Sequence, residues 1–157
     1  MKNRKDHADV KAHPPILLLI HVGAAWLLGR FTVLPIIVSP LIRGIGLLLA
    51  GIGFLLGVLS LYAFTKARTT LNPHGSVTSI VSSGVYRFTR NPIYLGMVFM
   101  LIGFPLAFGN VWGIPLVVAF IPLMNKLVIE REEAYLEKKF GEGYPGYKSR
   151  ARRGMVS

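Results

Sequence analysis

Two polar segments of this 157-residue chain hold most of the side chains that could do chemistry. The first is residues 65–94, TKARTTLNPHGSVTSIVSSGVYRFTRNPIY, whose small hydroxylated residues suit a loop that wraps a ligand. The second is residues 130–153, EREEAYLEKKFGEGYPGYKSRARR, which begins with several carboxylates. Arginines, carboxylates and tyrosines together favour a ligand that carries an anion, hydroxyl groups and an aromatic or cationic part.

The end of the first segment predicts the start of a helix. Asparagine is a favoured N-cap residue, and proline is favoured at the first helical position. We therefore expect a helix to begin at Pro92, with Asn91 as its cap and Tyr94 in its first turn. The N–H groups of a first helical turn can bind an anion, and Arg90 would place a positive charge beside them.

Two apolar stretches, Ile93–Phe108 and Val111–Ile129, connect the polar segments. Between them lies Gly109-Asn110, a pair that is typical of a tight turn between antiparallel helices. Such a hairpin would bring residues 90–94 beside Glu132-Glu133, so the two polar segments would meet at the membrane edge.

The second helix of this hairpin is expected to continue into water beyond its apolar part. Gly141 is a typical helix stop, which predicts that the helix ends near Phe140. After it, Tyr144-Pro145-Gly146-Tyr147 predicts a turn that carries two aromatic side chains.

Several ligands would suit the predicted meeting point. Glu132 could accept hydrogen bonds from ribose hydroxyls or an amino group, and Arg90 could bind a carboxylate or a phosphate. Tyr86 and Tyr94 could contact an adenine face or a sulfonium cation. S-adenosylmethionine has all of these parts and a nucleotide has several, so this argument alone leaves both open.

The composition indicates that a membrane-embedded scaffold positions these residues. Hydrophobic residues make up 52% of the chain and charged residues 16%, against about a quarter in a typical soluble domain. The apolar residues fall in four blocks, near 16–29, 44–64, 93–108 and 111–129. Since a spanning helix needs about 20 apolar residues, we predict an all-α polytopic membrane protein with about four transmembrane helices. Glycines within the second block favour close helix packing.

The chain is expected to form a single membrane domain over residues 1–157. A polar tail (1–13) would precede two transmembrane helices (14–64), and the rest (65–153) would form the cofactor-binding loop, the helical hairpin and a C-terminal helix in a cytoplasmic cap. A cleaved signal peptide is the alternative for the first block, but no convincing A-x-A site follows it.

The net charge of +11 is explained by membrane topology. All of the 18 basic residues except Arg30 and Arg43 fall on one side of the four-helix arrangement, and so do the seven acids. The positive-inside rule then predicts that both termini are cytoplasmic. The positive charge would attract anionic membrane lipids, and nucleic-acid binding is not expected.

Residue types that are missing or scattered exclude other chemistry. The chain has no cysteine, which removes disulfides, thiolate zinc sites and thiol nucleophiles. Its four histidines form no H-x-x-x-H pair, so no metal site is predicted.

The two motifs resemble a known family. SSGVYRFTRNPIYLG, a helical hairpin and EREEAYLEKKFGEGYPGYKSRARR, in this order, are similar to the isoprenylcysteine carboxyl methyltransferases and the related phospholipid methyltransferases. The resemblance covers about Thr65 to Arg153. It implies an S-adenosylmethionine-dependent methyltransferase with an all-helical membrane fold, no Rossmann domain and a lipophilic or membrane-proximal acceptor.

The resemblance also implies the residues that contact S-adenosylmethionine, with Arg90 added from the anion-binding argument above. Carried over residue by residue, the implied contacts are Thr78, Ser79, Ile80, Val81, Tyr86, Asn91, Pro92, Ile93, Tyr94 and Glu132. The catalytic residues and the oligomeric state stay open.

Two positions depart from the family pattern. Asn91 stands where the family often has a histidine, and both side chains can donate a hydrogen bond. Val128 stands where the prenylcysteine enzymes have an arginine for the substrate carboxylate, which weakens the case for a prenylcysteine acceptor. The alternative function is a non-catalytic membrane scaffold, or an assembly or transport subunit, but Glu132 and Arg90-Asn91-Pro92 favour an enzyme.

Overall fold

The computed structural model describes residues 7–8, 10–31, 38–70 and 77–151, so the predicted N-terminal tail lies partly outside the described residues. The described part is helical and contains no strand, which confirms the predicted all-α class. Its elements, in chain order, are α1 (Pro14–Phe31), α2 (Pro40–Lys66), a 3₁₀ turn η1 (Gly84–Arg87), α3 (Pro92–Phe108), α4 (Gly113–Met124), a π-turn η2 (Asn125–Ile129), α5 (Glu130–Phe140) and α6 (Gly143–Arg150).

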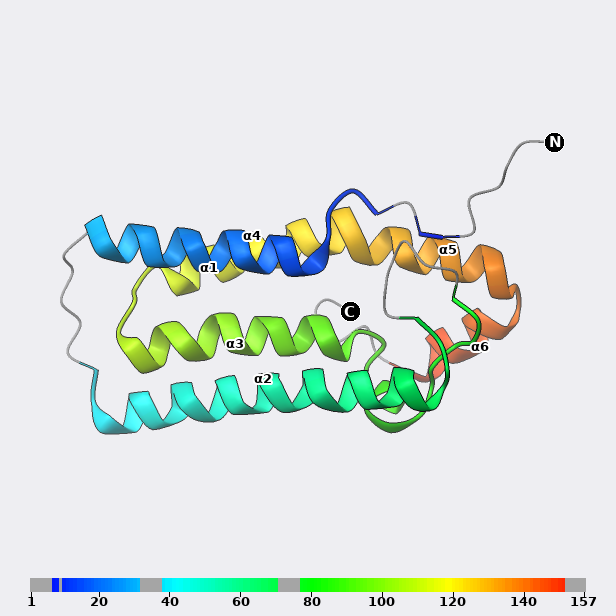
Figure 1. Cartoon of the computed structure of the whole chain (residues 1–157), viewed down its shortest axis with the longest axis horizontal. Helices are drawn as coiled ribbons and strands as arrows, with labels where there is room; N and C mark the ends of the chain where they lie inside the picture. The colour runs from blue at the N-terminus through cyan, green and yellow to red at the C-terminus, as the bar shows by residue number, and fades with distance from the viewer. Residues whose placement is uncertain (1–6, 9, 32–37, 71–76, 152–157) are drawn as a thin grey trace.

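The helices α1 to α4 form an elongated bundle. In Figure 1, α3 runs between α2 on one side and the α1 and α4 pair on the other, while α5 and α6 lie together at one end. Helices α1, α2 and the continuous helix Gly113–Phe140 are long and apolar enough to cross a membrane. Helix α3 is apolar but has 17 residues, or about 26 Å of helix. These features support an integral membrane protein.

Glycines bring α2 and α3 into backbone contact. A Cβ atom added at Gly46 would lie 2.5 Å from the backbone nitrogen of Ala107, and one added at Gly53 would lie 2.5 Å from the carbonyl oxygen of Gly96. On α3, a Cβ atom added at Gly103 would lie 2.5 Å from the backbone of Ala50. Glycine is therefore required on both helices for this close approach.

The turn between α3 and α4 is the predicted one. Helix α3 ends at Gly109, whose φ of 71° is the left-handed conformation that glycine adopts without strain. The side-chain oxygen of Asn110 accepts a hydrogen bond from the Trp112 N–H at 3.0 Å. Its side-chain nitrogen donates to the Ala25 carbonyl at 2.8 Å, which ties the hairpin to α1.

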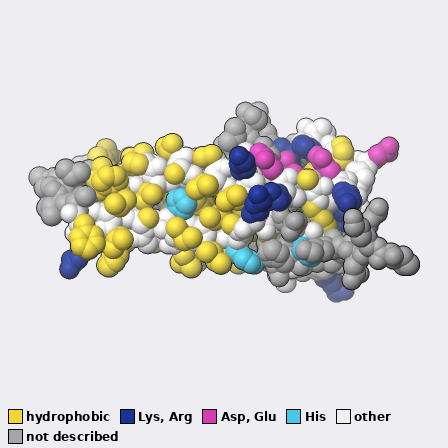
Figure 2. Space-filling model, turned by 90° about the horizontal axis from the view of Figure 1, so that it is seen from above, with side chains coloured by type: hydrophobic (Ala, Val, Ile, Leu, Met, Phe, Trp, Pro, Cys, Tyr) yellow, Lys and Arg dark blue, Asp and Glu magenta, His cyan; other side chains and the backbone are white. Residues whose placement is uncertain are grey.

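The second helix of the hairpin differs from the regular helix expected. The π-turn at Asn125–Ile129 separates the apolar α4 from the charged α5. A π-turn adds a residue to one turn, so it rotates the following side chains by about 100° relative to a regular α-helix. Figure 2 shows most of the charged side chains gathered towards one end of the molecule, while hydrophobic side chains predominate along the rest of the visible face and one basic side chain lies at the opposite end.

The C-terminal part confirms one expectation and corrects another. Helix α5 ends at Phe140 and Gly141 follows with a positive φ of 52°, as predicted. The predicted turn at Tyr144-Pro145-Gly146-Tyr147 is wrong, because these residues lie inside α6. Pro145 falls in the first turn of α6, where proline is tolerated because the N–H that it lacks has no partner within the helix.

Candidate functional site

A pocket of about 120 Å³ lies where the start of α3 meets α5 and α6. The end of α2 and the chain before η1 complete its wall. The lining residues are Phe64, Thr70, Val77, Ser79, Ile80, Val81, Tyr86, Arg90, Asn91, Ile93, Tyr94, Glu132, Glu133, Tyr135, Leu136, Tyr144 and Tyr147. The two polar segments therefore converge in space, as the hairpin argument predicts.

All of the residues predicted to contact the cofactor line this pocket except Thr78 and Pro92. Thr78 is exposed, and its hydroxyl donates to the carbonyl of Arg68 at 3.2 Å. Pro92 is fully buried at the start of α3. Thr78 thus holds the loop to the end of α2, and Pro92 sets the start of the helix.

Tyr94 and Glu132 join α3 to α5 inside the pocket. The Tyr94 hydroxyl lies 2.9 Å from each carboxylate oxygen of Glu132, 38 residues away in the sequence. The pKa of Glu132 is raised from 4.5 to about 7, mainly by burial; the hydrogen bond from Tyr94 opposes this increase, and the charge of Glu133 adds to it. A carboxylate has about four acceptor positions, so Glu132 can accept further hydrogen bonds from a ligand.

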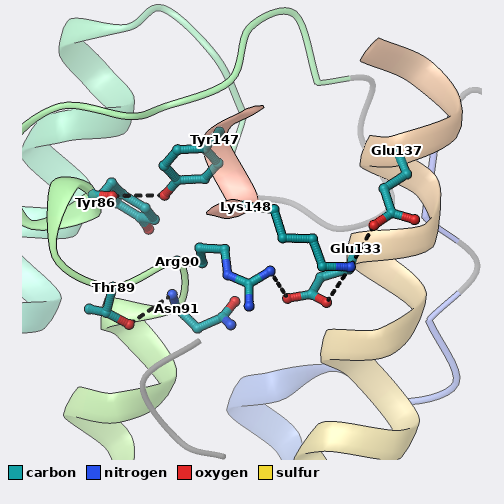
Figure 3. A network of polar contacts seen from close by, with 8 residues as sticks. All are labelled: Tyr86, Thr89, Arg90, Asn91, Glu133, Glu137, Tyr147 and Lys148. Atoms are coloured by element: carbon teal, nitrogen blue, oxygen red, sulfur yellow. Dashed lines mark hydrogen bonds and ion pairs between the residues drawn. The ribbon is translucent and has the colours of Figure 1, made fainter. Parts of the chain in front are cut away.

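The neighbouring carboxylate, Glu133, has different partners. It is buried, and its Oε1 lies 3.1 Å from an Arg90 guanidinium nitrogen (Figure 3). Lys148 lies 3.9 Å from the other oxygen of Glu133 and 2.6 Å from Glu137. The Nε of Arg90 is buried and has no hydrogen-bond partner within the described residues. Arg90 therefore reaches the pocket while its charge is balanced by Glu133.

Helix α6 is fastened over the pocket by a tyrosine. The Tyr147 hydroxyl donates to the carbonyl oxygen of Tyr86 at 2.8 Å, and both residues are buried (Figure 3). Burial raises the pKa of Tyr147 to about 12, against an opposing effect from the charge of Arg90. The hydroxyl therefore stays protonated at neutral pH and can donate this bond.

The start of α3 and its N-cap residue, Asn91, are where the sequence places them, but the capping hydrogen bond expected of asparagine is absent. Asn91 precedes the helix, yet its side chain makes no capping hydrogen bond. The N–H of Asn91 instead donates to the hydroxyl of Thr89 at 3.3 Å. Asn91 lines the pocket, so its side chain lies on the pocket side of the helix start.

Several pocket residues were absent from the predicted set. Tyr135, Leu136, Tyr144 and Tyr147 come from α5 and α6, and the aromatics there were a visible signal in the sequence. Thr70 follows α2 and belongs to the hydroxylated segment 65–94, although it was not named as a contact. Phe64 lies near the end of α2, and no sequence pattern pointed to it. It joins the pocket because α2 packs along α3, which is a tertiary effect.

Comparisons with known proteins identify a family. Residues 41–143, more than half of the chain, match the family model described as phospholipid methyltransferase. An uncharacterized protein of Haemophilus influenzae is 41% identical over 61 residues, which are 39% of this chain and 97% of that protein. No solved structure matches the chain.

Proposed function

This chain belongs to the phospholipid methyltransferase family of membrane methyltransferases, and we propose that it transfers a methyl group from S-adenosylmethionine to a lipophilic or membrane-proximal acceptor. The observation that carries the proposal is the pairing of Tyr94 with Glu132 in the wall of the pocket. This pairing joins the two sequence motifs at one spot, next to the cytoplasmic end proposed for the bundle.

The chemistry of the pocket fits the parts of S-adenosylmethionine. Glu132 would accept hydrogen bonds from the ribose hydroxyls or the amino group, and Arg90 with the start of α3 would bind the carboxylate. Tyr86 and Tyr94 would provide aromatic surface for the adenine or the sulfonium. The bound cofactor would supply an activated methyl group.

Catalysis in such a site would rest on position rather than on an acid or base. Holding two reactants in line can supply a large part of a rate enhancement. The pocket residues would orient the cofactor, and α6 would limit the access of water. The charge distribution supports an orientation with the pocket and both termini on the cytoplasmic side.

The acceptor is proposed to be lipophilic because the pocket lies at the end of an apolar bundle. An acceptor dissolved in the bilayer could bring its reacting group to the pocket at the membrane edge without leaving the membrane. Val128, fully buried beside α5, offers no charge for an acceptor carboxylate, so an acceptor other than a prenylcysteine is favoured.

A transfer assay tests this function. The purified protein would be incubated with methyl-labelled S-adenosylmethionine and a membrane lipid extract, and the lipids would be analysed for label. We expect labelled lipid with the native protein, and loss of labelling in Glu132→Ala. The matched control is Glu130→Ala. Glu130 lies on the same helix, but its carboxylate is exposed and accepts a hydrogen bond from the Asn125 side chain.

The outcome separates the two functions considered. Labelling that survives in Glu132→Ala would place the cofactor elsewhere. A folded protein that labels no lipid extract would contradict the proposed acceptor class and favour a non-catalytic membrane scaffold.

A further inference from the structure

A second cavity, open on one side, lies along the apolar bundle between α1, α3 and α4. Its volume is about 350 Å³, and it shares no lining residue with the pocket at the start of α3. Most of its wall is apolar, with large contributions from Trp26, Met100, Phe104 and Leu116. None of the described residues that line it is Lys, Arg, Asp or Glu. A charged ligand would therefore be desolvated here without compensation.

Two polar side chains, His21 and Asn110, interrupt this apolar wall. Both polar atoms of the Asn110 side chain already make hydrogen bonds: its nitrogen donates to the carbonyl of Ala25, and its oxygen accepts from the N–H of Trp112. These bonds serve the hairpin turn. Asn110 therefore offers little to a ligand, and His21 is the polar group that matters in this cavity.

The imidazole of His21 is held in one orientation. Its Nδ1 lies 2.8 Å from the carbonyl oxygen of Leu17, one helical turn earlier. Its ring meets Phe120 edge to face, with the ring centroids 5.0 Å apart at an angle of 80°. A carbonyl oxygen can only accept, so Nδ1 must carry the proton in this bond. In the neutral ring, Nε2 is then a hydrogen-bond acceptor.

The acceptor at Nε2 has no hydrogen-bond partner within the described residues, although His21 is only 6% exposed. His21 lies seven residues after Pro14, so it is about 10 Å along α1 from the start of the helix. Within the membrane, a ligand that donates one hydrogen bond would satisfy Nε2. Polar residues buried in spanning helices often mark functional sites.

We propose that this cavity binds a lipophilic alcohol, an apolar molecule with a hydroxyl group that donates to Nε2 of His21. The apolar walls receive the hydrocarbon part, and the lack of charge in the wall excludes an ionic headgroup. The cavity is separate from the proposed cofactor pocket. This inference therefore goes beyond the proposed function and does not depend on it.

Trp26 provides a direct reporter, because it lines the cavity and the chain has 2 tryptophans. The variant Trp112→Phe leaves Trp26 as the remaining fluorophore. Bromine quenches tryptophan fluorescence at short range, so ω-bromododecanol and bromododecane would be titrated into the protein in lipid nanodiscs. We expect saturable quenching by both probes, with the alcohol bound about five-fold more tightly because of one added hydrogen bond.

Two variants in the Trp112→Phe background sharpen the test. His21→Phe keeps an aromatic ring against Phe120 but has no acceptor, and it should abolish the preference for the alcohol. Ala25→Leu adds volume to the cavity wall and should reduce the quenching by both probes. Circular dichroism and gel filtration would show that each variant is folded, and if His21→Phe does not fold, Ala25→Leu and the comparison of the two probes still test the proposal.

Three results would overturn the proposal. Equal affinities of the two probes for the protein with native His21 would show an apolar cavity that does not select a hydroxyl. A preference for the alcohol that persists in folded His21→Phe would place its hydroxyl elsewhere. Quenching that does not saturate and is unchanged in folded Ala25→Leu would reflect lipid contact at the exposed face of Trp26.

Discussion

The apolar bundle and the charged cap of this protein are held together by different interactions. The bundle, α1 to α4, depends on close backbone contact at glycines such as Gly46 and Gly53. The cap, which consists of residues 77–91, α5 and α6, depends on a buried carboxylate paired with an arginine and on tyrosine hydroxyls. The bundle should therefore be sensitive to added volume, and the cap to changes in charge and protonation. The bundle sets the distance between the two motifs, and the cap carries the proposed chemistry.

The largest effect is expected from added volume in the bundle. Gly53→Ala would place a methyl group 2.5 Å from the backbone oxygen of Gly96, where no side chain can move aside. We expect the variant to lose about 3 kcal/mol of stability, at the upper end for overpacking. Thermal unfolding in detergent would measure the loss.

The control for this variant is Gly51→Ala on the same helix. A Cβ atom at Gly51 meets nothing within 4 Å. Alanine is favoured over glycine inside helices, so this change should be neutral or slightly stabilising. Equal destabilisation by both variants would contradict the assignment of the contact to Gly53.

The second largest effect is expected from removing a buried negative charge in the cap. Glu133→Gln would leave the buried guanidinium of Arg90 without its carboxylate and should cost about 2 kcal/mol. Glu137→Gln removes a partly exposed partner of Lys148 and should cost less than about 0.5 kcal/mol. Hydrogen exchange would show whether α6 opens in the first variant. Equal protection of α6 in both variants would contradict the special role of Glu133.

The third effect is a dependence of cofactor binding on pH. The pKa of Glu132 is raised to about 7 in the free protein, so its carboxylate becomes protonated as the pH falls below 7. If the cofactor needs the ionised form, S-adenosylmethionine should bind about ten-fold more weakly at pH 6 than at pH 8. Titration calorimetry across this range would measure it, and constant affinity would show that the ionisation of Glu132 is not required.

The smallest effect concerns the hydrogen bond that fastens α6. Tyr147→Phe would remove the donor to the carbonyl of Tyr86 and should cost about 1 kcal/mol. Tyr62→Phe is the control, because Tyr62 is exposed on α2. Limited proteolysis should cut the C-terminal part faster in Tyr147→Phe alone, whereas equal rates in both variants would argue against this bond as a fastener.

The bundle could be predicted from the sequence because its signals are local and strong. Apolar blocks of spanning length and a Gly-Asn turn sufficed to place α3 and α4 and to bring Tyr94 beside Glu132. The glycines of α2 indicated close packing, but the partner helix could be identified only from the structure.

The cap could be predicted only in part, because its interactions are tertiary. Pro145 and Gly146 disfavour a helix locally, yet they lie in α6, whose Tyr144 and Tyr147 are buried against the pocket wall. The ion pair between Arg90 and Glu133 depends on how the chain just before α3 lies against α5. Neither feature has a periodic signal in the sequence.

The central claim is that the pocket between α3, α5 and α6 binds S-adenosylmethionine through Glu132. Its most direct test is calorimetric titration of the purified protein with S-adenosylmethionine and S-adenosylhomocysteine, beside Glu132→Ala and Glu130→Ala. We predict saturable binding to the native protein and to Glu130→Ala, and no detectable binding to folded Glu132→Ala. Equal affinity of the two variants, or no binding to the folded native protein, would contradict the claim.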